Sequence, residues 1–154
     1  MKNNKGFTLI ELIVVIVVLG ILSVVAVPQF VDFAGDARKS TIAGTNGAIK
    51  SAVALTHSKA LIEGLKAQEV ATVNDVDIRY GYPDSTETGI VAALDISGEF
   101  TYNVVDQDNL AIVAEGYTYQ EAANVADACQ IIYTRAIAKG DKPVVVSETD
   151  GCIN

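Results

Sequence analysis

The chain has few of the residues from which catalytic and metal sites are built. Its 154 residues include one histidine, two cysteines and no tryptophan. The histidine, His57, has no cysteine near it in the sequence, and no nucleophile motif is visible. A catalytic triad needs a nucleophile beside a base, and a zinc site needs several nitrogen or sulfur ligands. The composition therefore argues against an enzyme, and we expect no cofactor.

Basic residues are also scarce. The chain has 11 lysines and arginines against 19 aspartates and glutamates, which gives a formal net charge of -8. An acidic surface repels the phosphates of nucleic acids, and no basic stripe is visible in the sequence. We therefore expect no nucleic acid among the partners of this protein.

The acidic residues do not form a recognisable calcium loop. Asp106 and Asp108 have oxygen ligands that suit Ca²⁺. However, the spacing of an EF-hand, its central glycine and its terminal glutamate are absent. The alternative is that both carboxylates belong to a solvated hairpin turn. We favour the turn and predict no metal site.

A long apolar run lies near the N-terminus. It extends over 21 residues from Phe7 to Val27, with Glu11 as its single charged residue. As a helix it would measure about 31 Å, which matches the hydrocarbon thickness of a bilayer. Lys2 and Lys5 precede it without an accompanying acid, which places the N-terminus on the cytoplasmic side. We predict that the run spans a membrane and that the rest of the chain lies outside the cytoplasm.

This run differs from an ordinary secretory signal. Such signals have apolar stretches of roughly 7 to 15 residues followed by small residues at the cleavage site. Here Pro28, Gln29 and Phe30 follow the run, which favours cleavage before it rather than after it. A carboxylate within an apolar span is costly without a partner. Glu11 therefore requires either the positive end of its own helix or a cation on another subunit.

Residues 1 to about 34 resemble the type IV pilins and the related pseudopilins. The shared signature is a short basic leader, a glycine, Phe-Thr-Leu-Ile-Glu and an apolar helix. The resemblance implies that Gly6 precedes the bond cut by a prepilin peptidase and that Phe7 becomes the N-methylated first residue. It also implies that Glu11 docks a subunit by attracting the Phe7 amine of its neighbour. The implied partners are identical subunits in a helical filament, an inner-membrane assembly platform and minor pilins.

Scattered residues in the remainder resemble one subgroup, the mannose-sensitive haemagglutinin (MSHA) major pilins. They are Phe33 to Arg38 (FAGDAR), the Gly81-Tyr82-Pro83 turn with Thr88-Gly89-Ile90, and the closing Gly151-Cys152. This resemblance implies an attachment pilus of a Gram-negative bacterium that initiates biofilms. It further implies storage of the subunit in the inner membrane, export into an extracellular pilus, and a surface glycan as receptor.

The predicted organisation has three parts. Residues 1-6 form a cleaved leader, residues 7-34 a hydrophobic transmembrane and filament-core helix, and residues 35-154 a periplasmic or extracellular head. The helix is expected to continue to about Ile62, so that the head includes its outer half. Gly20 and Pro28 both weaken helices, and the stretch between them is expected to bend or melt.

The outer half of this helix is amphipathic. Its apolar residues, at helical spacing, predict a face that packs on a sheet. Gly44 and Gly47 fall in the same stretch and would allow a kink. The apolar face consists of Ile42, Ile49, Val53 and Ala60.

The head is expected to complete the α+β fold of type IV pilins with a four-stranded antiparallel sheet. One pair of strands surrounds the turn at residues 106-109, and the other extends over Gln130 to Ile137 and Lys142 to Ser147. Glu63 to Pro83 is expected to be a surface loop. Thr88 to Ile96 is expected to be a short helix.

Cys129 and Cys152 bracket the last pair of strands. Both would lie in the oxidising periplasm, where a disulfide is expected. Closing a loop of 24 residues would contribute about 3 kcal/mol in the chain-entropy model. The closed segment resembles the disulfide-bounded C-terminal region of type IV pilins.

The function that follows is that of a major structural subunit of an MSHA-like type IV pilus. One alternative is a pseudopilin of a type II secretion system, which would form a short periplasmic piston. Another is a periplasmic binding or catalytic domain on a plain membrane tether, in which case the chain would remain uncleaved after Gly6.

Overall fold

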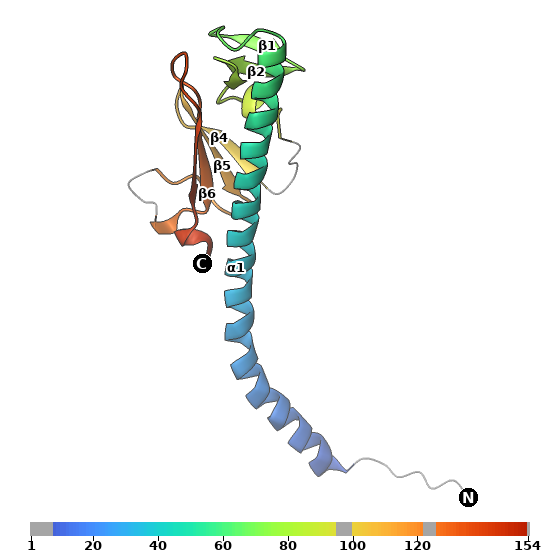
Figure 1. Cartoon of the computed structure of the whole chain (residues 1–154). Helices are drawn as coiled ribbons and strands as arrows, with labels where there is room; N and C mark the ends of the chain where they lie inside the picture. The colour runs from blue at the N-terminus through green and yellow to red at the C-terminus, as the bar shows by residue number, and fades with distance from the viewer. Residues whose placement is uncertain (1–7, 95–99, 122–125, 154) are drawn as a thin grey trace, which may run out of the picture.

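One long helix organises the structure. The computed structural model describes residues 8-94, 100-121 and 126-153, without the side chains of residues 25-32 and 153. The helix α1 extends without a break over Leu9–Ile62. Figure 1 shows its outer half beside the sheets of the head, while its N-terminal half, in blue, projects away from them. The predicted continuation of the helix to Ile62 is thus observed.

The outer half of α1 packs through the predicted apolar face. Ile42, Ile49 and Ala60 are fully buried, and Val53 is partly buried against the main core. Because these residues share one face of a helix, one side of α1 covers the sheet while the other faces solvent.

The helix ends through a backbone conformation that glycine provides. Gly64 has a φ of 74°, in the left-handed region. The next N–H, from Leu65, donates to the carbonyl of Ala60 at 2.8 Å. This arrangement is a Schellman-type cap, which satisfies a free carbonyl at the helix end.

Four antiparallel strands form the main sheet, as predicted. They are arranged in the order β4 (Phe100–Val104), β5 (Asn109–Ala114), β6 (Gln130–Thr134) and β7 (Val144–Glu148). In this register Ile112 of β5 pairs with Tyr102 on one side and Ile131 on the other. The main core lies between this sheet and α1 and includes Ile42, Ile49, Leu110, Ile112, Ile131 and Tyr133.

The prediction of a surface loop over Glu63 to Pro83 is wrong in its second half. Three short antiparallel strands form there: β1 (Ala71–Val73), β2 (Val76–Arg79) and β3 (Tyr82–Pro83). The cause is the turn between β1 and β2, where two consecutive residues adopt left-handed φ angles. Such a two-residue turn matches the twist of paired strands. The two residues are Asn74 (φ 47°) and Asp75 (φ 62°).

Short helices join the strands in the part of the head that the structure describes, and two of them concern the predictions. The π-helix η1 (Glu87–Val91) stands where a helix over Thr88 to Ile96 is predicted, but it ends earlier. It is anchored at its start, since the N–H of Ile90 donates to the carbonyl of Asp84 at 2.9 Å. The last two residues of the predicted helix lie outside the described residues. The 3₁₀-helix η3 (Asp150–Ile153) carries Cys152.

Candidate functional site

Glu11 lies in the first turn of α1 and contacts the residue that precedes the helix. Its Oε2 accepts hydrogen bonds from the backbone N–H and the hydroxyl of Thr8, both at 2.8 Å. The carboxylate thereby caps its own helix near the positive end of the dipole. Within the described residues, Oε1 accepts no hydrogen bond. Because the side chain is exposed, this oxygen is open to a cation from outside the subunit.

The apolar residues around Glu11 are exposed throughout. From Leu9 to Val24 the large apolar side chains are between 46% and 76% exposed. On the same helix, Ile42 and Ile49 are 0% exposed. Leaving apolar surface in water costs about 25 cal/mol per Å². This half of α1 therefore requires a second apolar environment outside the subunit.

The predicted membrane span and cleavage site extend beyond the described residues. Gly6 and Phe7 lie outside them, and so do the side chains of residues 25-27. Among the residues that are described, no helix has the length and apolar character needed to cross a membrane.

Gly20 and Pro28 both lie inside α1, which continues through them. A Cβ placed on Gly20 would meet no described atom within 4 Å, so packing within the subunit does not require a glycine there. Proline lacks an N–H and disturbs the turn before it. Figure 1 shows α1 curving in its N-terminal half. Local melting between the two residues stays a prediction.

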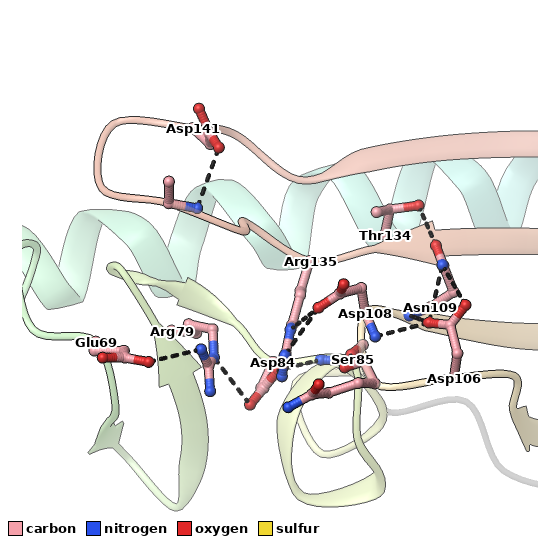
Figure 2. A network of polar contacts seen from close by, with 12 residues as sticks. Glu69, Arg79, Asp84, Ser85, Asp106, Asp108, Asn109, Thr134, Arg135 and Asp141 are labelled. Carbon is pink, nitrogen blue, oxygen red and sulfur yellow. Dashed lines mark hydrogen bonds and ion pairs between the residues drawn. The ribbon is translucent and has the colours of Figure 1, made fainter.

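A buried arginine connects segments that are distant in the sequence (Figure 2). Arg135, whose side chain is 7% exposed, donates from Nη1 to Asp84 and from Nε to Asp108, each at 2.9 Å. Arg79 lies 3.9 Å from the second oxygen of Asp84 and donates to Glu69 at 3.0 Å. Burial alone would lower the pKa of Arg135. The carboxylates of Asp84 and Asp108 outweigh this effect, so the pKa of Arg135 is raised.

Both calcium candidates have partners within the head. Oδ1 of Asp106 accepts the N–H groups of Asp108 and Asn109 at 2.8 Å, and the amide of Asn109 donates to both of its oxygens. These hydrogen bonds, led by the Asn109 side chain, lower the pKa of Asp106. Asp108 pairs with Arg135. The geometry is that of a capped hairpin turn, and no metal-binding cluster of acids, histidines or cysteines occurs among the described residues.

The predicted disulfide between Cys129 and Cys152 is present, with an S–S distance of 2.05 Å. The bond is buried in the main core. Beside it, a Cβ on Gly151 would lie 2.1 Å from the backbone oxygen of Asp127. Only glycine therefore allows the C-terminal segment to approach so closely. The hydroxyl of Tyr117 donates to the carbonyl of Cys152 at 3.2 Å.

His57 packs against an aromatic neighbour. Its ring stacks on Tyr82 with centroids 4.0 Å apart. Its Nδ1 lies 3.0 Å from the carbonyl oxygen of Gly81, and since a carbonyl only accepts, Nδ1 carries the proton. Tyr133 has a similar structural role, donating to the carbonyl of Pro83 at 2.6 Å. Burial raises the pKa of Tyr133, so its hydroxyl stays protonated.

Sequence analysis did not single out Arg135 or Asp84. The available signal is weak: Arg135 follows directly on the apolar run of β6, where a charge needs a partner. Its partners come from positions 84 and 108, and nothing local identifies them.

Comparison with known proteins adds information on the N-terminal segment and on the chain as a whole. Residues 1–27 match a family described as a prokaryotic N-terminal methylation motif. Two fimbrial proteins of Pseudomonas aeruginosa are 33% and 34% identical over 109 and 106 residues. These alignments cover 71% and 69% of this chain but only 64% and 62% of the relatives, so the chain spans less than two thirds of their length.

A third relative matches a shorter region. The type IV narrow pilus major component PilA5 of Thermus thermophilus is 48% identical over 51 residues, which cover 33% of this chain and 44% of the relative. No solved structure matches the chain significantly.

Proposed function

We propose that this chain is a structural subunit of a type IV pilus. The methylation motif and the fimbrial relatives support type IV pilin as its family. One observation carries the proposal: the N-terminal half of α1 exposes its apolar residues from Leu9 to Val24, while the core of the head begins only at Ile42. A fibre in which neighbouring helices surround each other buries this surface. The role is structural and requires no chemistry by the subunit.

Assembly begins with cleavage between Gly6 and Phe7, which creates a new amine at the start of the mature chain. Its pKa of about 8 keeps it cationic at neutral pH. One oxygen of Glu11 caps its own helix through Thr8, and the other has no partner among the described residues. Glu11 can therefore keep its own cap and still pair with the Phe7 amine of a neighbour, and this pairing sets the stagger of successive subunits.

The finer assignment is an MSHA-like attachment pilus on a Gram-negative cell. Its support is the set of residues that resemble this subgroup, from the FAGDAR segment to the closing Gly151-Cys152. Subunits wait in the inner membrane, where the assembly platform and minor pilins add them to the fibre. The exposed fibre contacts surface glycans and initiates biofilms. The names of the relatives, a fimbrial protein and a pilus component, favour a pilus subunit over a secretion pseudopilin.

The test combines the mass of the native protein with electron microscopy of cells. We expect a mature chain that begins with N-methylated Phe7, and fibres that contain it. Glu11→Gln should leave the subunit in the membrane fraction but reduce fibres by at least about tenfold, because a buried amine loses its charged partner. Glu115→Gln, a change at an exposed acid of the head, is the matched control and should assemble normally.

A second variant separates docking from helix capping. Thr8→Val removes one of the two hydrogen bonds to Glu11 and leaves the carboxylate charged. If helix capping were the whole role of Glu11, Thr8→Val would also reduce the number of fibres. Under the proposal this variant still assembles. Native chains that retain Met1, or that form only short periplasmic fibres in a type II secretion system, would refute the pilus assignment.

A further inference from the structure

At the outer end of α1 the head contains a pocket of about 490 Å³. It lies between the small sheet β1–β3 and the hairpin that joins β6 to β7. Figure 1 shows this hairpin, in red, rising beside the small sheet. The volume falls in the range of roughly 300 to 1,000 Å³ that is typical of small-molecule sites. Its principal lining side chains are His57, Lys66, Tyr80, Tyr82, Lys139 and Lys142.

The pocket concentrates positive charge in an acidic protein. Three of the eight lysines of the chain line it, although the formal net charge is -8. Lys66, Lys139 and Lys142 are exposed, and none of them forms an ion pair with another described residue. Asp141 also lines the pocket, but its carboxylate accepts the N–H of Ala138 at 3.1 Å within its own hairpin (Figure 2). Three ammonium groups thus surround one cavity without a matching set of acids.

Aromatic rings form another part of the wall. Tyr82 is held by its stack on His57, with an angle of 4° between the rings. Tyr80 has a φ of 49°, a strained conformation for a bulky residue and one that clusters at ligand sites. The same turn passes close to the backbone at Lys66, since a Cβ on Gly81 would lie 2.9 Å from the Cα of Lys66. The Tyr82 ring is therefore held in place by its stack on His57, and the backbone at Lys66 lies beside the turn that carries both tyrosines.

We propose that this pocket binds a carboxylate-bearing sugar of an acidic polysaccharide. The lysines would pair with the carboxylate, and a tyrosine face would contact the apolar face of the sugar ring, since aromatic side chains combine an apolar body with a polar tip. The ammonium groups act as point charges that need no fixed fork geometry. The inference names a ligand class for the glycan attachment proposed above and in that respect rests on the proposed function.

Binding is measured by titration calorimetry on the full-length protein in detergent. The probe is an oligogalacturonate, and the matched control is the same oligosaccharide with its carboxylates methyl-esterified, which keeps the rings and removes the charge. We expect the acid to bind, the ester to bind at least about tenfold more weakly, and binding to weaken with added salt. Equal binding of acid and ester, or no binding of either, would overturn the proposal.

Variants locate the site. Lys139→Gln/Lys142→Gln should weaken binding of the acid by at least about tenfold. Lys50→Gln/Lys59→Gln removes the same charge from exposed positions outside this pocket and should bind as the unmodified chain does. Equal weakening by both pairs would show a general charge effect and contradict the proposal. Circular dichroism and the mass of the disulfide-bonded chain check that each variant is folded.

Two further probes test the ligand class. A sulfated oligosaccharide of the same length that bound as tightly as the uronate would overturn the choice of a carboxylate, and a DNA oligonucleotide that bound more tightly would overturn the choice of a sugar. Filament assembly is scored separately. Fibres without uronate binding refute the inference alone, whereas uronate binding without fibres refutes the proposed function alone.

Discussion

Arg135 is one of the residues that connect the two sheets. It follows β6, and its two carboxylate partners come from the end of β3 and the start of β5. A buried charge is tolerated only when partners satisfy it. The same reasoning explains Tyr133, whose buried hydroxyl reaches the carbonyl of Pro83. These two buried polar groups therefore link segments of the head that are distant in the sequence.

Arg135→Met should destabilise the head by about 3 kcal/mol, because Asp108 would lose its ion pair and, of its ion pairs, Asp84 would keep only the 3.9 Å contact with Arg79. The thermal unfolding midpoint of the full-length chain in detergent, followed by circular dichroism, measures the loss. Lys50→Met removes an exposed cation from α1 and should change the midpoint little. Similar midpoints for both variants would show that the buried pairs contribute no net stability.

Asp106 should make stability depend on pH. Its hydrogen bonds lower its pKa in the folded state, so its contribution is complete above the ordinary aspartate pKa of about 4. The contribution disappears as the pH falls through the lowered folded-state pKa. We expect Asp106→Asn to be less stable than the unmodified chain at pH 7, and the difference to shrink below about pH 4. Thermal unfolding midpoints of the variant and the unmodified chain, measured from pH 7 to below about pH 4, test this expectation. A difference in midpoint that does not change with pH would contradict it.

The two halves of the helix α1 differ in how far their apolar side chains are buried. Its outer half is stabilised by one buried face, while its N-terminal half exposes apolar residues on all sides. Pro28 stands near the join, and the helix continues through it. Gly44 and Gly47 would allow a kink, yet the helix is unbroken there. Ile42 precedes the two glycines and Ile49 follows them, and both pack in the core between the helix and the sheet.

Gly44→Ala and Gly47→Ala should each stabilise the head by about 0.8 to 1 kcal/mol, the usual difference between these residues in a helix. Neither Cβ would meet a described atom within 4 Å. Thermal unfolding of the full-length chain measures the gain. Gly151→Ala is the opposite control, since its Cβ would meet the backbone of Asp127 and should lower the midpoint. If stabilised variants form fewer fibres, the glycines serve close packing between subunits.

As a whole, the molecule is a rod with a head on its outer half (Figure 1). The head has its own core, closed by the disulfide, whereas the described side chains from Leu9 to Val24 of the rod are exposed. This asymmetry fits the proposed pilus subunit, because the buried core of the head lies apart from the apolar side chains that neighbouring subunits would cover.

A chain that starts at residue 35 should therefore fold and remain monomeric without detergent, whereas the mature chain from Phe7 should aggregate. The difference arises from the side chains between Leu9 and Val24, which are 46% to 76% exposed. Size-exclusion chromatography with light scattering measures both species. Aggregation of the truncated chain would show that the head needs the N-terminal half of α1.

Several features follow from local pattern alone. The apolar run, the amphipathic stripe from Ile42 to Ala60 and the strand pairs each have a period or a turn signal that can be read in a short window. The disulfide follows because the chain has only two cysteines and its sequence predicts an export topology. The small sheet was missed because its strands of two to four residues are too short for alternation to be recognised.

Other features arise only when distant segments come together. Asp84 and Asp108 meet Arg135 across 51 and 27 residues, and lysines at positions 66, 139 and 142 surround one pocket. The fold brings these side chains together, and their proximity is not encoded in a local window. The apolar helix could thus be recognised from composition and spacing, whereas the ion-pair network and the lysine pocket depend on packing between the sheets.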